Sequence, residues 1–172
     1  MTAPDRYRAT WGEGDMLHFP GGFWIEKGVP ADALPEGDEI PSAVAAVYTT
    51  RVEGDVELYE TIRLTAEDAE LDISFVVVGA LQDEPNLLYV MEPNTGGIMQ
   101  LDLERHDVRG VNSTFRLFVE FLHRFALFVD DAADAADRPR RAAELRGTLE
   151  RLDPGAFQED AWWPLVFEQL TA

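Results

Sequence analysis

Two adjacent glycines, in the segment MEPNTGGIMQ (residues 91–100), are the first feature of the sequence that could bind a ligand. A phosphate-binding loop surrounds an anion with backbone N–H groups, stands before a helix and usually adds a lysine. Here Glu92 precedes the glycines, Asp102 follows them, and the single lysine of the chain is Lys27. An anion would be repelled at this position, so we expect no phosphate site.

The stretches on either side of the glycines predict a β-hairpin instead. Residues 98–104 alternate hydrophobic and polar side chains, and residues 86–92 are rich in strand-forming types. Pro93 presets the backbone for a turn, Asn94 can bond to its own backbone, and the two glycines accept positive φ. The Pro-Asn-Thr-Gly-Gly segment therefore predicts the connection between two strands.

Residues that could bind a metal or act as a nucleophile are few and poorly spaced. No histidine stands in a His-Glu-x-x-His motif, no serine stands in Gly-x-Ser-x-Gly, and the chain has no cysteine. We therefore expect no metal, no cofactor and no catalytic residue. His123 is expected at the surface or boundary of a helix, and Ser113 as a helix cap. The residues considered are His18, His106, His123, Ser42, Ser74 and Ser113.

The segment ERHDVRG (residues 104–110) gathers two arginines, a histidine and an aspartate after a predicted strand, where catalytic groups are often found. A catalytic role would also need a nucleophile or a cleft beside these residues, so we expect a solvated loop. Carboxylate pairs are too common in this chain for their spacing to nominate an acid and a base. A carboxylate-dependent hydrolase stays an alternative, and it predicts a cleft with two acids of separated pKa values.

Charge is the strongest feature of the composition. The 33 acidic and 14 basic residues give a formal net charge of −19, with the excess thickest in the first two thirds of the chain. Such a surface repels nucleic acid and anionic lipid and speeds encounter with a basic partner. The basic group RPRR (138–141) follows DDAADAAD, so mutual neutralisation is expected rather than phosphate binding. Solubility alone is the simpler explanation of the charge.

Any site must be positioned by the predicted secondary structure, in which strands come first along the chain and helices follow them. Residues 44–51, 56–64 and 71–81 are rich in Val, Ile, Tyr, Phe and Thr, and with the hairpin they predict about five consecutive strands. The economical arrangement is a mainly antiparallel sheet of about five to six strands packed by C-terminal helices, which is an α+β fold.

Three helices are predicted in the last third. Aromatic residues recur at steps of three and four from Phe115 to Val129, after a cap at Asn112 or Ser113. The segment RRAAELRGTLERLDPG (140–155) predicts a second amphipathic helix that ends at its Asp-Pro-Gly, and a short third helix contains Trp162 and Trp163. The broad aromatic stripe of the first helix is expected to pack on the sheet.

At 172 residues the chain is expected to form one domain, over residues 15–172, after a loosely ordered polar segment at 1–14. The stretch from residue 16 to 41 mixes hydrophobic residues with four prolines and is expected to hold a short helical turn or strand inside long loops. No signal region and no membrane-spanning run is found, and the lack of cysteine fits a reducing compartment, so we expect a cytoplasmic protein.

Three segments in this order resemble the SUKH superfamily, and more narrowly its fourth group of bacterial immunity proteins. They are FWIEKGVP (23–30), LLYVMEPNTGGIMQLDLE (87–104) and VNSTFRLFVEFLHRF (111–125), and the late WWPLVFEQL is similar to the Trp-bearing C-terminal helix of that group. The resemblance implies helices around a mainly antiparallel sheet, no catalytic residues, and an antidote that neutralises toxin domains, often nucleases, in polymorphic toxin systems.

We expect the protein to block the toxin by stoichiometric binding. Its acidic loops would pair with the arginines and lysines with which a nuclease binds phosphates. By this charge argument we expect the partner to be a basic cognate protein toxin domain, and neither a nucleic acid nor a membrane. A regulatory scaffold that responds to a ligand or partner without any toxin is the alternative. The acids expected to contact the partner are Glu36, Asp38, Glu39, Glu53, Asp55, Glu57, Asp83 and Glu84.

Overall fold

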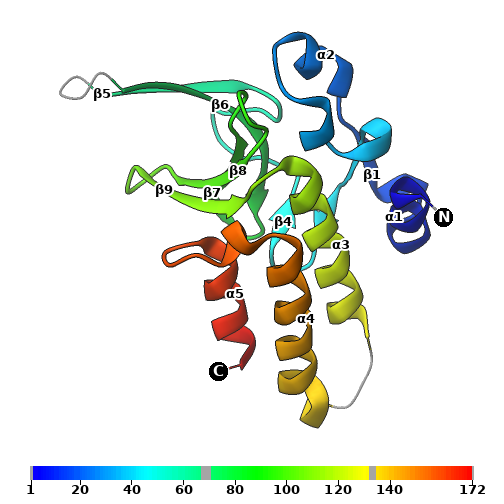
Figure 1. The fold of residues 1–172 in the computed structure, drawn as a ribbon. Coiled ribbons are helices and arrows are strands. Elements are labelled where there is room, and N and C mark those ends of the chain that lie inside the picture. Colours follow the sequence, from blue (N-terminus) through cyan, green and yellow to red (C-terminus); the bar gives the residue numbers. More distant parts are fainter. Residues whose placement is uncertain (1, 67–70, 132–134, 172) are drawn as a thin grey trace.

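Seven strands form one antiparallel sheet, in the order β3–β4–β6–β7–β8–β9, with β5 paired to the first part of β6 (Figure 1). The computed structural model describes residues 2–66, 71–131 and 135–171. The strands are β3 (Ala43–Val44), β4 (Tyr48–Thr49), β5 (Thr61–Ala66), β6 (Leu71–Leu81), β7 (Glu84–Met91), β8 (Ile98–Asp102) and β9 (Asp107–Asn112). Two further strands, β1 (Met16–His18) and β2 (Glu39–Pro41), pair with each other in a separate two-stranded sheet.

The α+β fold is confirmed, as a single compact domain, and the hairpin around the two glycines joins β7 to β8. Gly96 adopts a φ of 76°, and a Cβ there would stand 2.6 Å from the Cβ of Ala33, so the position requires glycine on both counts. Glu92 supports the turn from one side, because its carboxylate accepts the N–H groups of Asn94 and Thr95. The hairpin is therefore a structural turn.

Strand boundaries differ from the prediction in three places. Residues 44–51 form two short strands because Ala46 turns the chain at a φ of 72°. The strand expected from residue 56 begins at Thr61, after a turn in which Tyr59 has a φ of 68°. The segment 104–110 is not one solvated loop, because Asp107 opens β9 and only the residues before it form the turn.

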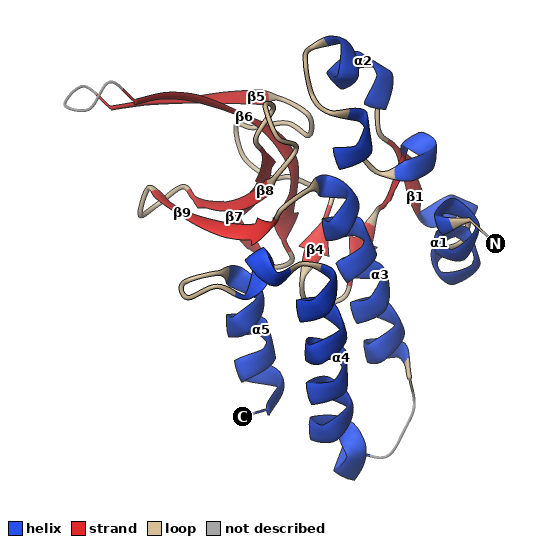
Figure 2. Ribbon diagram, in the orientation of Figure 1, coloured by secondary structure: helices blue, strands red, loops and turns tan. Residues whose placement is uncertain are grey.

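Three helices pack side by side below the sheet, as Figures 1 and 2 show. They are α3 (Phe115–Asp130), α4 (Arg138–Leu152) and α5 (Trp162–Thr171), so all three predicted helices are confirmed. The cap of α3 is Thr114, whose hydroxyl accepts the N–H of Leu117 at 3.1 Å, and neither Asn112 nor Ser113 as predicted. Part of the acidic connection before α4, residues 132–134, lies outside the described residues.

The main core lies between the sheet and these helices. Phe118 of α3 contacts the rings of Tyr48 and Tyr89 on the sheet, and Trp163 of α5 contacts Phe121 and Phe125. All of these side chains are buried, which confirms that the aromatic stripe is core. A smaller cluster on the other face of the sheet packs against Val52 and Val56 of the segment before β5.

Residues 3–11 form a helix, in contrast to the loosely ordered segment predicted at 1–14. Helix α1 (Ala3–Trp11) begins with a capping box between Thr2 and Asp5 and buries Tyr7 against α3. The contact of Tyr7 with α3, which no local pattern indicates, adds to the capping box in holding this helix in place. Helix α2 (Gly21–Glu26) and short 3-10 turns fill the segment between β1 and β2, close to the predicted mixture of turns and loops.

Candidate functional site

One open groove at the edge of the sheet collects acidic residues from two separate parts of the chain. This edge groove has a volume of about 630 Å³ and lies between β3–β4, the residues after β4 and the turn from β6 to β7. Its polar lining includes Ser42, Thr50, Arg51, Glu53, Asp83 and Glu84. Three of the eight predicted partner-binding acids meet in this hollow.

The geometry of the β6–β7 turn places the last two of these acids. Leu81 pairs with Glu84 across a two-residue turn, and Asp83 takes a φ of 67°, which aspartate tolerates better than most residues. The side chain of Gln82 accepts the backbone N–H of Ala46 at 2.7 Å and so ties the turn to the β3–β4 hairpin. The turn therefore presents Asp83 and Glu84 in a defined position, both exposed.

The electrostatics of the edge groove favour a cation. Three carboxylates, from Glu53, Asp83 and Glu84, face one guanidinium group, that of Arg51. Among the described residues, no hydrogen bond or ion pair of these four side chains is found. Their charges are thus left for solvent or for a partner.

The remaining predicted acids lie elsewhere. Asp55 and Glu57 are exposed in the segment before β5 but do not line the groove. Glu36 forms an ion pair of 3.5 Å with Arg116, and Glu39 one of 3.0 Å with Arg8. These two acids hold the β2 region against α1 and α3, a structural role that sequence reasoning missed because the arginines are far away in the chain.

Asp38 also has a local structural role. Its backbone takes a φ of 53°, its carbonyl accepts the N–H of Phe19 at 2.8 Å, and its side chain lies against Gly21, where a Cβ would overlap the carboxylate. The structure thus brings together three of the eight predicted residues and separates the other five. A charge-based prediction could not sort them, since all eight are acidic residues in or next to turns and loops.

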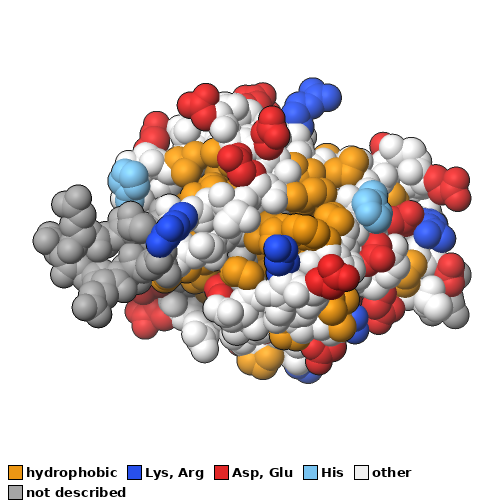
Figure 3. Space-filling view, turned by 90° about the horizontal axis from the view of Figure 1, so that it is seen from above, with side chains coloured by type: hydrophobic (Ala, Val, Ile, Leu, Met, Phe, Trp, Pro, Cys, Tyr) orange, Lys and Arg blue, Asp and Glu red, His pale blue; other side chains and the backbone are white. Residues whose placement is uncertain are grey.

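Acidic side chains are also spread over the face drawn in Figure 3, where Asp and Glu surround a central hydrophobic area. The most exposed large hydrophobic side chains of the described chain include Phe23 and Ile25 of α2, which are 50% and 45% exposed. Aromatic and aliphatic residues in such positions can anchor a protein partner, while the surrounding charges set its orientation.

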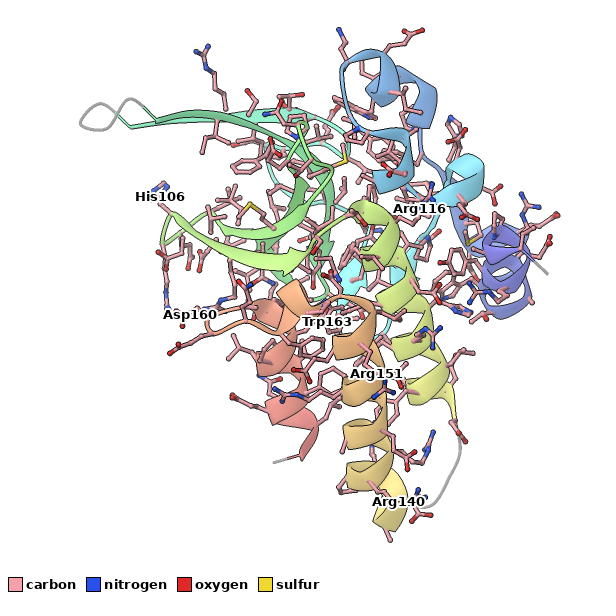
Figure 4. The ribbon with its side chains drawn as sticks, viewed as in Figure 1. His106, Arg116, Arg140, Arg151, Asp160 and Trp163 are labelled. Carbon is pink, nitrogen blue, oxygen red and sulfur yellow. The ribbon has the colours of Figure 1, made fainter. Side chains whose placement is uncertain are left out.

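No group of metal-ligating side chains comes together in the part of the chain that the structure describes. Ser113 donates to Asp153 and so supports structure. His123 is buried, in contrast to the predicted surface or boundary position, and burial lowers its pKa. His106 lies exposed in the β8–β9 turn, as Figure 4 shows, far in the fold from the helix that carries His123. The three histidines do not form one site.

Two polar networks beneath the surface were not predicted. Glu120 accepts hydrogen bonds from Tyr7, Arg6 and Arg124, and it fastens α1 to α3. Asp153, which follows the last residue of the second predicted helix (α4), is the centre of the other network.

Asp153 is only 2% exposed and accepts the N–H and hydroxyl groups of Ser113 and the amide of Asn112. Asn112 in turn accepts the indole N–H of Trp163 at 2.9 Å, so the network joins β9, α4 and α5 (Figure 4). The Asp-Pro-Gly sequence signalled only a helix stop, since the partners lie about forty residues or more away in the chain.

No helix among the described residues is long and apolar enough to cross a bilayer.

Comparison with known proteins gives one match. No curated protein and no solved structure matches the chain. The sequence model of the SUKH-4 immunity proteins matches residues 23–169, which include the hairpin, the aromatic helix and the Trp-bearing helix. The chain therefore belongs to the SUKH-4 immunity protein family.

Proposed function

We propose that this protein neutralises a cognate toxin domain by binding it, without catalysis, and that the edge groove is part of the contact surface. The family supports a toxin-neutralising role. The observation that carries the proposal is the meeting of Glu53, Asp83 and Glu84, from separate segments, in one open groove without described partners. An immunity protein needs such a surface and no catalytic group.

The chemistry of the groove indicates the kind of toxin. A nuclease active site carries lysines and arginines that bind phosphate, and the groove offers carboxylates to those same groups. The net charge of −19 adds long-range attraction between the two proteins. Steering of this kind can raise association rates from about 10⁵–10⁶ to about 10⁸–10⁹ M⁻¹s⁻¹ at low salt. We therefore propose a basic nuclease domain as the partner, met in the cytoplasm of the producing cell.

The first experiment is a pull-down from native cells with the tagged protein at low and at raised salt, followed by mass identification of the retained proteins. A basic partner with a nuclease-like domain, lost as salt rises, is the expected result. The purified domain is then assayed for nuclease activity with increasing amounts of the protein, and inhibition should be complete at one equivalent.

Charge reversal tests the groove itself. The triple variant Glu53→Lys, Asp83→Lys, Glu84→Lys should associate with the toxin domain more slowly and with a weaker dependence on salt. A matched control changes three exposed acids outside both the groove and the ion pairs described above: Glu13→Lys, Asp130→Lys and Glu150→Lys. It alters the net charge equally.

Two results would contradict the proposal. Equal association rates for the two triple variants would show that total charge, and not the groove, attracts the toxin. Absence of any retained or inhibited toxin would favour the regulatory alternative, in which the same fold responds to a partner or small molecule.

A further inference from the structure

Helix α1 is held to the rest of the protein largely by polar contacts. It lies at the side of the molecule against α3, with Tyr7 buried and Ala3 and Trp11 only partly buried (Figure 1). A hollow of about 230 Å³ lies between the two helices, lined by Ala3 and Tyr7 of α1 and by Leu117 and Glu120 of α3. Because little apolar surface is buried here, α1 belongs to the parts of a protein that open at a low cost in free energy.

The second half of α1 covers the side chain of His123 in α3. The centres of the Tyr7 and Trp11 rings lie 5.0 and 5.4 Å from the centre of the imidazole, and the hydroxyl of Thr10 lies 2.8 Å from its Nε2 atom. The histidine is only 4% exposed. Detachment of α1 would therefore bring this imidazole into contact with water.

The contacts of the imidazole leave no place for a second proton. The hydroxyl of Thr10 donates to the carbonyl oxygen of Arg6 at 3.2 Å, so toward His123 it can only accept. Nε2 therefore carries the proton of the neutral ring, and Nδ1 carries none. Nδ1 is shielded from solvent and has no hydrogen-bond partner among the described residues. A proton added there would be a buried donor without an acceptor, which is costly.

The charged groups that face the ring come from α1 and α3. Arg6 and Arg124 are positive, and Glu120 is negative. The carboxylate of Glu120 already accepts hydrogen bonds from Tyr7 and from both arginines. Burial lowers the pKa of His123, and the two arginines lower it further. Together they outweigh Glu120 and the carbonyl of Arg6, which raise it. The docked helix thus favours the neutral imidazole.

The link that follows α1 permits a movement of the helix. Gly12 has a φ of 78°, which glycine adopts freely, and a Cβ at Gly12 or Gly14 would meet nothing within 4 Å. Arg8 and Glu39 tie α1 to β2 by an ion pair of 3.0 Å, but both side chains are partly exposed, so the pair holds the helix weakly. The match to the SUKH-4 family begins at residue 23, after α1. Helix α1 is thus an appendage on the matched part of the fold.

We infer that α1 is a pH-sensitive strap, which detaches from α3 at mildly acidic pH when His123 takes up a proton, while the sheet and α3–α5 stay folded. With α1 detached, His123 is in water and its pKa is about 6.5, and the docked helix lowers that pKa. Docking is therefore fully favoured above about pH 6.5. Its equilibrium constant falls up to about tenfold for each pH unit below that, down to the lowered pKa. Detachment uncovers the face of α3 that holds Glu120 and His123, whether or not a toxin is the partner.

Hydrogen exchange of the full-length protein, followed by mass spectrometry at pH 7.5, 6.5 and 5.5, measures the detachment. Protection is corrected for the pH dependence of intrinsic exchange. Residues 3–11 should be at least about a hundredfold less protected than α5 at each pH, because α1 opens without the rest of the fold. Their protection should fall about five- to tenfold between pH 6.5 and 5.5. Return to pH 7.5 should restore it.

Variants of the three histidines assign the effect. His123→Gln keeps an amide that can donate to Thr10 but takes up no proton, so the protection of α1 should be the same at pH 6.5 and 5.5. His18→Gln and His106→Gln change exposed histidines and should keep the fall. Glu120 stays ionised over this range, because its pKa is lowered from an ordinary value of 4.5. In the unchanged protein, the imidazole NMR signals of His123 should titrate with a midpoint below pH 6.5.

Three results would overturn the strap. Equal protection of α1 and α5 would show that the helix opens only when the whole protein unfolds. A fall of protection that persists in His123→Gln would assign the pH dependence to another group. A titration midpoint of His123 at or above pH 6.5 would show that docking does not disfavour its proton. If His123→Gln leaves α1 unprotected at every pH, the titration and the exchange of the unchanged protein decide.

Discussion

The hydroxyl group of Tyr7 donates a hydrogen bond of 2.6 Å to the carboxylate of Glu120, and this pair fastens α1 to α3. Arg6 and Arg124 add hydrogen bonds to the same carboxylate. Burial alone would raise the pKa of Glu120, but the hydrogen bonds from Tyr7 and the two arginines outweigh it, and the pKa is lowered. The attachment of α1 therefore depends on an ionised Glu120.

Replacement of Glu120 by glutamine should destabilise the protein. The amide removes the charge that both arginines face, but these arginines are more than a third exposed and screened by water. We therefore expect a loss of about 1–2 kcal/mol in the free energy of unfolding. Urea denaturation measures it. The control Glu144→Gln breaks an exposed helix pair with Arg140 and should cost less than about 0.5 kcal/mol. Equal losses would contradict the role of Glu120.

His123 makes stability depend on pH. Burial lowers the pKa of this histidine, while Glu120 raises it and Arg6 and Arg124 lower it further. The unfolded chain thus binds a proton at a higher pH than the folded protein, so stability falls as the pH drops below about 6.5. Urea midpoints between pH 7.5 and 5.5 should decrease, and decrease less in His123→Gln. Identical slopes for the two proteins would show that His123 does not titrate on unfolding.

Replacement of Asp153 should lower the free energy of unfolding more than replacement of the exposed acids. Its carboxylate accepts three hydrogen bonds from Asn112 and Ser113 in a buried site, and Asp153→Ala would leave those donors without partners. We expect a loss of about 2–4 kcal/mol, against about 1 kcal/mol for Ser113→Ala, which removes one donor. Thermal unfolding followed by tryptophan fluorescence, to which Trp163 beside the network contributes, measures the change. A stability close to that of the unchanged protein would show that the network contributes little.

Position 79 of β6 requires glycine because the ring of Tyr48 lies against its backbone, and not because of the strand conformation. A Cβ at this position would overlap the ring of Tyr48, which is fully buried and cannot move away. Gly79→Ala should cost at least about 1–3 kcal/mol. Gly110 of β9 is the matched control, because a Cβ there meets nothing within 4 Å. Gly110→Ala should be neutral or slightly stabilising. Denaturation curves that do not differ between the two variants would contradict the close contact.

The sequence by itself determined the features that depend on neighbours along the chain. The step of three and four in the aromatic residues is enough to predict α3, because a helix repeats every 3.6 residues and must bury one face. The turn chemistry of residues 93–97 predicts the β7–β8 hairpin for a similar reason, since each residue acts on its own backbone. The family resemblance followed from these same segments.

Only the tertiary structure decided which acids are available to a partner. Glu36 and Glu39 look like Glu53 and Asp83 in the sequence, but Arg116 and Arg8 reach the first two and no described arginine pairs with the others. The attachment of helix α1 to α3, the burial of His123 and the network of Asp153 also depend on contacts between distant segments. Local patterns contain no information on such contacts, because folding brings these groups together only when the sheet and the helices pack.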